Sequence, residues 1–177
     1  MKILLTYFEP FDGRDENVSR LVVKNLEQTY DNIDVLPIPV SWEKAFVTLK
    51  PVINNYNYII LCGEAKHRNN TMMEYIAINL MNANIPDNDG IVKINEKISN
   101  VEAYATKFDV FAISKKTNIE VSLSAGSYLC NYLYYKSLEY IEMNKLNSKC
   151  MFVHFPIPYD VKYENQLLKI IEAISND

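Results

Sequence analysis

Runs of consecutive apolar residues alternate along the chain with amphipathic segments, and this alternation predicts strands followed by helices. Short runs of adjacent apolar residues are typical of buried strands, which we expect at 2–7, 33–36, 58–62, 74–80, 119–122 and 150–155. Apolar residues three or four positions apart predict helices at 19–30, 42–49, 109–117, 128–143 and 163–174. Ser41 is the expected N-cap of the second helix, and Pro51 is expected to kink or end it. Residues 91–101 show neither a helix nor a strand pattern, and their secondary structure is left unassigned.

Strands that alternate with helices indicate a single α/β domain over residues 1–177, with three layers (α/β/α) and a mostly parallel, twisted central sheet. A chain of 177 residues is long enough to bury one sizeable core. In parallel sheets, binding sites lie beyond the carboxyl ends of the strands. That rule places segments 8–13, 63–68 and 126–130 together with His154 at one edge of the sheet.

Composition excludes several classes of function. The formal net charge is −4 and Lys and Arg form no cluster, so neither nucleic acid nor an anionic membrane is an expected partner. Three irregularly spaced cysteines predict free thiols in the cytoplasm rather than a disulfide framework. With only two histidines and no CxxC pair, we expect no zinc site, and we expect no cofactor. The apolar run at 3–5 is too short for a signal peptide, and no segment approaches the length of a membrane-spanning helix.

The segment from Ser122 to Asn131 predicts a strand, a sharp turn at Ala125-Gly126 and the start of a helix. With Ser127 as the N-cap, Cys130 would be the third helical residue, near unpaired main-chain N–H groups and the positive end of the helix dipole. Such surroundings stabilise a thiolate, so we expect a lowered pKa for Cys130 and a nucleophile at this position. The alternative is a structural core cysteine, because Cys130 also shares a helical face with apolar residues.

A cysteine nucleophile needs a base, and the two histidines are the candidates. His154 ends an apolar strand beside the predicted Cys130 turn, whereas His67 lies in a polar loop, so His154 is the better base. Glu74 opens an expected strand and is the candidate for orienting the imidazole. A hydrogen-bonded core histidine and a solvated strand end are the structural alternatives for these two residues. Cys62 and Cys150 lie inside apolar strands and are expected to be inert.

Five sequence blocks occur in an order and spacing shared with a known family: FEPF at 8–11, EYIAIN at 74–79, IPDN at 85–88, SAGSYLCN at 124–131 and HFP at 154–156. Through these blocks the chain resembles the pyroglutamyl-peptidase I family of cytosolic cysteine peptidases, also called pyrrolidone-carboxylate peptidases. The resemblance covers residues 1 to about 158.

The resemblance implies a thiol peptidase that removes N-terminal pyroglutamate from peptides, with Cys130 as nucleophile, His154 as general base and Glu74 as the orienting residue. It implies aromatic walls for the pyrrolidone ring from Phe8 and Phe11, with Tyr128 and Asn17 also lining the pocket. It adds Glu64, Asn84, Ile85 and Leu129 as further substrate-binding positions. The family's tetramers imply a homo-oligomer.

The chain departs from the family at the shell around the substrate. Asn84 stands where the family has an Arg that stabilises the oxyanion, and Glu64 stands where the family has a Gln. Lys66 and His67 replace two glycines; Lys66 or Arg68, or the Asn84 amide itself, are candidates to replace the lost donor. Two alternatives therefore stay open: a cysteine hydrolase of the same fold with another substrate, and a weakly active or inactive protein that binds pyroglutamyl groups.

Overall fold

The structure is a computed structural model that describes residues 1–175. Its strands are β1 (Ile3–Phe8), β2 (Ile33–Ile38), β3 (Tyr58–Ala65), β4 (Met72–Glu74), β5 (Ile76–Ile78), β6 (Met81–Ala83), β7 (Lys93–Glu96), β8 (Ala103–Ala105), β9 (Glu120–Ser122) and β10 (Lys149–Pro156). Its helices are α1 (Val18–Glu27), α2 (Ala45–Leu49), the 3₁₀ helix η1 (Lys50–Asn55), α3 (Val110–Thr117), α4 (Leu129–Met143) and α5 (Lys162–Ser175). Among the described residues, no helix is both long and apolar enough to span a membrane.

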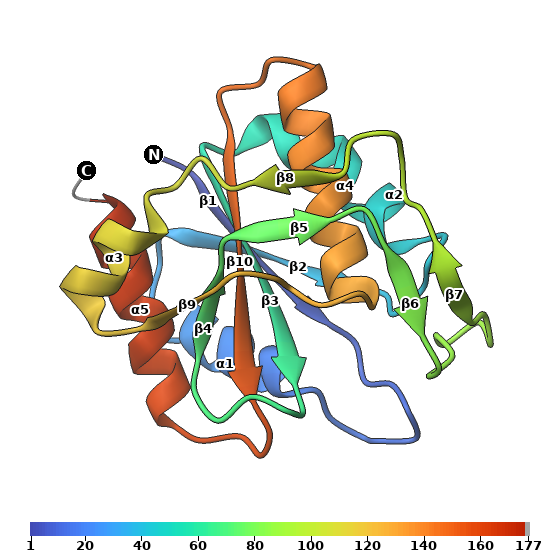
Figure 1. The fold of residues 1–177 in the computed structure, drawn as a ribbon. Helices are drawn as coiled ribbons and strands as arrows, with labels where there is room; N and C mark the ends of the chain where they lie inside the picture. The colour runs from blue at the N-terminus through green and yellow to red at the C-terminus, as the bar shows by residue number, and fades with distance from the viewer. Residues whose placement is uncertain (176–177) are drawn as a thin grey trace.

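A six-stranded sheet in the order β2-β1-β3-β10-β4-β9 forms the centre of the fold (Figure 1). The first four of these strands run parallel to one another, and β4 pairs antiparallel with β10. The last strand, β9, runs parallel to β4. The predicted mostly parallel sheet is therefore confirmed, and β4 with β9 is its antiparallel part.

Helices cover both faces of the sheet, which confirms the three-layer α/β/α architecture (Figure 1). Alternation along β3 shows how one strand serves both layers. Ile59 and Leu61 face the core under α2 and α4, whereas Ile60 and Cys62 face the core under α1, α3 and α5. Both faces of β3 are buried, which is why its sequence is a continuous apolar run instead of an alternating one.

The segment predicted as one strand at 74–80 is two short strands in different sheets, which corrects that prediction. Glu74 ends β4 in the central sheet, and β5 pairs with β8 in a separate two-stranded sheet. The chain changes sheet at Tyr75, whose N–H donates to the carbonyl of Ser122 across 2.7 Å. Residues 91–101, which no pattern assigned, contain β7, which pairs with β6.

Two helix starts also differ from the prediction. Ser41 is not the N-cap of α2, because the helix begins at Ala45. The Ser41 hydroxyl instead accepts from the main-chain N–H of Lys44 in the turn before that helix. The first helix begins one residue earlier than predicted because Asn17 caps it, accepting from the N–H of Ser19 across 3.0 Å.

Candidate active site

The predicted turn at Ala125-Gly126 forms before α4, but the N-cap of the helix is one residue later than predicted. Gly126 has a φ of 84°, a left-handed conformation that favours glycine. Tyr128 is the N-cap, and Cys130 is therefore the second helical residue instead of the third. Ser127 is not the cap, because its hydroxyl donates to the carbonyl of Asn82 across 2.6 Å. The cysteine still lies in the first turn of α4, at the positive end of the helix dipole.

Gly63 allows the cysteine to approach the sheet. A Cβ on Gly63 would lie 2.9 Å from the Cys130 sulfur and 2.8 Å from the Phe152 ring, closer than real Cβ contacts. β3 continues through this glycine to Ala65, three residues beyond the predicted end of the strand at residue 62. Its role is to leave room for the Cys130 thiol against the main chain of β3.

That close packing reverses the expected acidity of the thiol. Burial, together with the nearby Glu74 carboxylate, raises the pKa of the Cys130 thiol to about 12, against a smaller lowering by its own main-chain N–H. The expectation of a lowered pKa was wrong, because desolvation outweighs the helix terminus. At neutral pH the resting thiol is protonated and needs a base to act as a nucleophile.

His154 lies on the same face of the sheet as the Cys130 sulfur. In the register of β10 with β3, His154 is directly opposite Gly63, the residue that the sulfur contacts. Its ring packs against Phe152 with centroids 4.6 Å apart. Only 4% of His154 is exposed, so the ring is held by packing as well as by hydrogen bonds.

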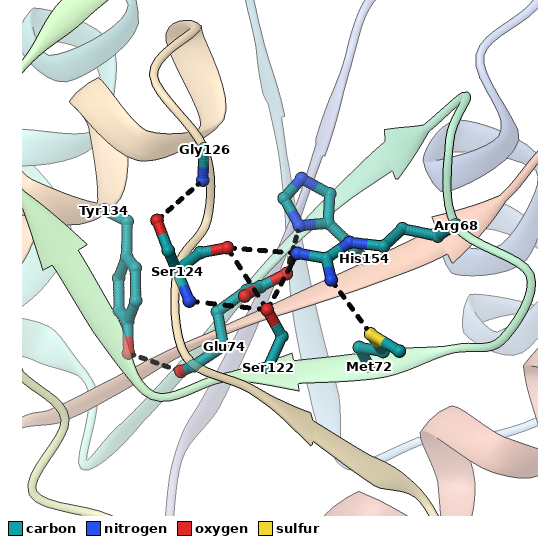
Figure 2. Close-up of polar contacts among 8 residues, drawn as sticks. All are labelled: Arg68, Met72, Glu74, Ser122, Ser124, Gly126, Tyr134 and His154. Carbon is teal, nitrogen blue, oxygen red and sulfur yellow. Dashed lines mark hydrogen bonds and ion pairs between the residues drawn. The ribbon is translucent and has the colours of Figure 1, made fainter.

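The carboxylate of Glu74 holds one nitrogen of this imidazole (Figure 2). Its Oε1 lies 2.7 Å from His154 Nδ1, and Glu74 is fully buried. β4 and β10 place the two residues diagonally across an antiparallel pair, because Glu74 is opposite Phe152. Figure 2 shows the other ring nitrogen directed away from Glu74, and it has no hydrogen-bond partner among the described residues.

Arg68 completes this arrangement and was not recognised in the sequence as a partner of Glu74 (Figure 2). Its Nη2 lies 3.0 Å from Glu74 Oε1, 2.7 Å from the Ser122 hydroxyl and 3.0 Å from the carbonyl of Ser124. The guanidinium therefore neutralises the buried carboxylate behind the imidazole. These contacts hold the guanidinium against Glu74, Ser122 and Ser124, and Arg68 also lines the cavity that contains Cys130 and His154.

An open cavity of about 440 Å³ joins the thiol and the imidazole. Cys130 and His154 both line this open cavity, with Gly126 and Ser127 on the α4 side and Lys66 and His67 on the β3 side. Glu74 does not line it, since the histidine lies between. The structure thus brings together the three residues predicted from the sequence, with the thiol and imidazole open to a ligand and the carboxylate behind them.

A second, smaller cavity is also lined by Cys130, and His154 is not among its lining residues. This inner cavity of about 30 Å³ is lined by residues of β1, β3, the start of α4 and the loops after β1 and β2: Phe8, Phe11, Asn17, Val40, Glu64, Tyr128, Leu129 and Cys130. Six of the eight predicted substrate-binding residues are among these, the exceptions being Asn84 and Ile85. A cavity of roughly 10–15 Å³ is already large enough for one water molecule.

The two exceptions lie farther out. Ile85 lines an outer cavity of about 180 Å³ together with Phe11 and Lys66. Asn84 is exposed and lines none of these three cavities. It is nevertheless close in the chain to Asn82, whose N–H donates to the carbonyl of Ser127 across 2.9 Å.

Glu64 faces the inner cavity, as the sequence suggested, but it is not a free charge. Its Oε1 forms an ion pair with Arg14, and its Oε2 accepts from the N–H of Val18 across 2.8 Å. Only 2% of the Glu64 side chain is exposed. Arg14 comes from the loop before α1 and was not identified in the sequence as a partner of this carboxylate.

The other two cysteines are core residues, as predicted. Cys62 and Cys150 are buried, and burial raises the pKa of both thiols. All three cysteines are free thiols.

A parallel α/β sheet that brings a thiol, an imidazole and a buried carboxylate to one edge is typical of cysteine hydrolases, and we assign the protein to that class. A family model described as Pyroglutamyl peptidase matches residues 1–168. Pyrrolidone-carboxylate peptidase 2 of Caldanaerobacter subterraneus is 39% identical over 169 residues, covering 88% of this chain and 81% of that relative.

Solved structures agree with these sequence matches. Pyroglutamyl peptidase I of Bacillus amyloliquefaciens has a TM-score of 0.87 and 29% identity, covering 96% of this chain and 93% of that one. Pyrrolidone carboxyl peptidase from Thermococcus litoralis has a TM-score of 0.87 and 30% identity, covering 99% and 93%. The chain belongs to the pyroglutamyl peptidase family of cysteine peptidases.

Proposed function

We propose that this chain removes pyroglutamate from the N-terminus of peptides, with Cys130, His154 and Glu74 as its catalytic triad. The observation that carries the proposal is the shared open cavity of Cys130 and His154, with Glu74 2.7 Å from the far side of the imidazole. Acyl transfer by a side-chain nucleophile requires this arrangement, in which a base faces the nucleophile and a carboxylate orients the base from its other side.

In the first half of the reaction, the Cys130 sulfur attacks the carbonyl carbon of the pyroglutamyl residue, and its proton moves to the free nitrogen of His154. Because the resting thiol has a raised pKa, this proton transfer is a necessary part of the attack. Glu74 accepts from Nδ1, which keeps the other nitrogen unprotonated and then stabilises the imidazolium.

In the second half, His154 returns the proton to the leaving amine, and the C–N bond breaks to leave a thioester on Cys130. A water molecule then attacks the thioester carbonyl while His154 accepts a proton from it. The thiolate leaves, regains a proton from His154, and pyroglutamate is released. The overall reaction consumes one peptide bond and one water molecule and produces a carboxylic acid and an amine.

The inner cavity is the proposed site of the pyrrolidone ring. Phe8 and Phe11 supply flat apolar walls, which suit an uncharged five-membered lactam. Cys130 lies in the wall of the same cavity, so a ring bound there presents its exocyclic carbonyl to the sulfur. The leaving peptide then extends into the open cavity, where His154 is available to protonate its amine.

Turnover of a pyroglutamyl chromogenic amide tests this function. The matched control is the prolyl amide, which has the same five-membered ring without the lactam carbonyl. The proposal expects hydrolysis of the first and not the second. Absence of turnover of both amides would favour one of the two alternatives, a hydrolase with another substrate or a protein that only binds pyroglutamyl groups.

We expect the wild type to be slow, and Asn84→Arg to raise its kcat. Loss of one oxyanion donor lowers kcat by about 10²–10³. Asn84 lines none of the three cavities, and an Arg at this position restores the residue type that the resemblance assigns to the oxyanion donor. Steady-state kinetics on the pyroglutamyl amide should show kcat rising about tenfold, with Asn100→Arg at an exposed position as the control. An unchanged kcat in Asn84→Arg would show that another group already serves the oxyanion.

The raised pKa of Cys130 predicts how its alkylation depends on pH. With a pKa of about 12, the thiolate fraction at neutral pH is very small and grows with pH. The rate of iodoacetamide labelling of Cys130 should therefore rise about tenfold per pH unit from pH 7 to 10. Labelling is followed by mass spectrometry, with Cys130→Ala as the blank because the other two thiols are buried. A rate that levels off below pH 8 would indicate a preformed thiolate and contradict the raised pKa.

We also propose that the chain acts in the cytoplasm and self-associates. Three free thiols support a reducing compartment. Self-association rests on the resemblance to a family of tetramers and is measured by light scattering of the purified chain.

A further inference from the structure

The ion pair between Arg14 and Glu64 connects the floor of the inner cavity to its outer wall. Glu64 is on β3, one residue after Gly63, and its side chain is buried against the start of α1. Its carboxylate is satisfied on both oxygens, by the Arg14 guanidinium and by the N–H of Val18. A buried carboxylate with no counter-charge next to a site for a neutral ring would be strongly destabilising.

Arg14 reaches Glu64 because its loop folds back on itself. Asp12 and Gly13 both have left-handed φ angles, 57° and 69°, and the N–H of Arg14 donates to the carbonyl of Phe11 across 3.2 Å. This turn brings the Arg14 guanidinium over the Phe11 ring, with 5.0 Å between its central carbon and the ring centroid. Arg14 therefore contacts both a cavity wall on the loop and a carboxylate on the sheet.

Phe11 is the wall of the inner cavity that comes from a loop. The inner cavity of about 30 Å³ shares Phe11 and Glu64 with the outer cavity. Phe8 is in the central strand β1 with 3% exposure, whereas Phe11 is only half-buried and lies on the loop. Phe11 also contacts Tyr128, with ring centroids 5.9 Å apart. Because the Arg14 guanidinium contacts both the Phe11 ring and the Glu64 carboxylate, it connects this loop wall to the sheet.

We propose that Arg14 is a positioning residue for ring recognition, which neutralises Glu64 and ties the Phe11 wall to the sheet. The proposal rests on the proposed function. It also explains why a carboxylate is tolerated at position 64, where the resemblance gives the family a Gln. Arg14 acts on the binding of the ring and not on proton transfer, because it contacts neither Cys130 nor His154.

A cycle of three variants tests this role: Arg14→Gln, Glu64→Gln and the double variant. Arg14→Gln leaves the Glu64 carboxylate without its counter-charge, and KM for the pyroglutamyl amide should rise about tenfold with kcat changed less than about twofold. In the double variant both groups are neutral amides, and the amide oxygen introduced by Glu64→Gln can still accept from the N–H of Val18. The double variant should therefore recover most of the KM lost in Arg14→Gln.

The matched control is Arg20→Gln, which removes an exposed ion pair with Glu16 on the surface of α1. It should change neither KM nor kcat. An unchanged KM in Arg14→Gln, or a double variant worse than Arg14→Gln, overturns the proposal. A parallel fall in kcat and thermal stability, without a rise in KM, assigns Arg14 a structural role and also overturns it.

Turnover of the pyroglutamyl amide by the wild type tests the proposed function separately from the role of Arg14. Wild-type turnover with unaltered variants refutes only the role of Arg14. If the wild type does not turn over the pyroglutamyl amide, calorimetric titration with free pyroglutamate measures the Kd of the wild type and of the same three variants. Absence of binding there overturns both proposals.

Discussion

Cys130→Ala and His154→Ala are each expected to lower kcat on a pyroglutamyl amide by roughly 10⁴–10⁶-fold, and the double variant should be little worse than either. The first change removes the atom that forms the thioester. The second leaves a thiol with a pKa of about 12 and no base to take its proton. Because the two groups serve one step, their losses do not add.

Cys62→Ala is the matched control for the loss of a thiol. Cys62 is buried on the opposite face of β3, in the core under α1 and α5, and its thiol does not reach the open cavity. This variant should keep near-normal kcat, with at most a modest loss of thermal stability. Full activity in Cys130→Ala would falsify the assignment of the nucleophile.

Glu74→Gln is expected to lower kcat by about 10²–10⁴-fold with little change in KM. A Gln at this buried position can turn its NH₂ toward His154 Nδ1 and favour the wrong tautomer, in which the nitrogen facing the thiol is protonated. It also loses the charge that stabilises the imidazolium and that pairs with Arg68. The activity that remains should exceed that of Cys130→Ala, since Glu74 orients the base and does not attack.

Glu120→Gln provides the comparison for this change. Glu120 is an exposed carboxylate on β9, beside β4, and accepts from the side chain of Asn70. Its replacement should leave kcat and KM unchanged. A Glu74→Gln variant as active as Glu120→Gln would mean that the imidazole is held adequately by packing against Phe152 alone.

The layers of the fold and the edge that carries the site were predictable from the sequence because they depend on local patterns. Continuous apolar runs identify β1, β3 and β10, and the rule for parallel sheets then brings Cys130 and His154 to one edge. The split of residues 74–80 was not predictable, because two short apolar strands in different sheets have the same local pattern as one strand.

Arg14 and Arg68 show the limit of sequence reasoning at the site. Both come from polar loops, and their importance follows from buried carboxylates that lie 50 and 6 positions away in the chain. A carboxylate expected inside a sheet was the available signal, since buried charges are normally paired. That signal indicates that a partner exists and does not identify it.

The acidity of Cys130 depends on two opposing effects, only one of which is local. The helix terminus is visible in the sequence and lowers a thiol pKa. Packing of the sulfur against Gly63 depends on how close α4 lies to β3, and the burial that results raises the pKa. The helix position was predicted almost correctly, yet the direction of the shift was wrong.

Intact-mass spectrometry after acid quenching tests the central claim most directly. The purified chain is mixed with an activated pyroglutamyl ester, so that the acylation step is faster than release by water. We predict that the wild type gains the mass of one pyroglutamyl group, that peptide mapping places it on Cys130, and that Cys130→Ala gains none. Turnover of the ester by the wild type with the acyl group on another residue, or an equal gain in Cys130→Ala, would contradict the account.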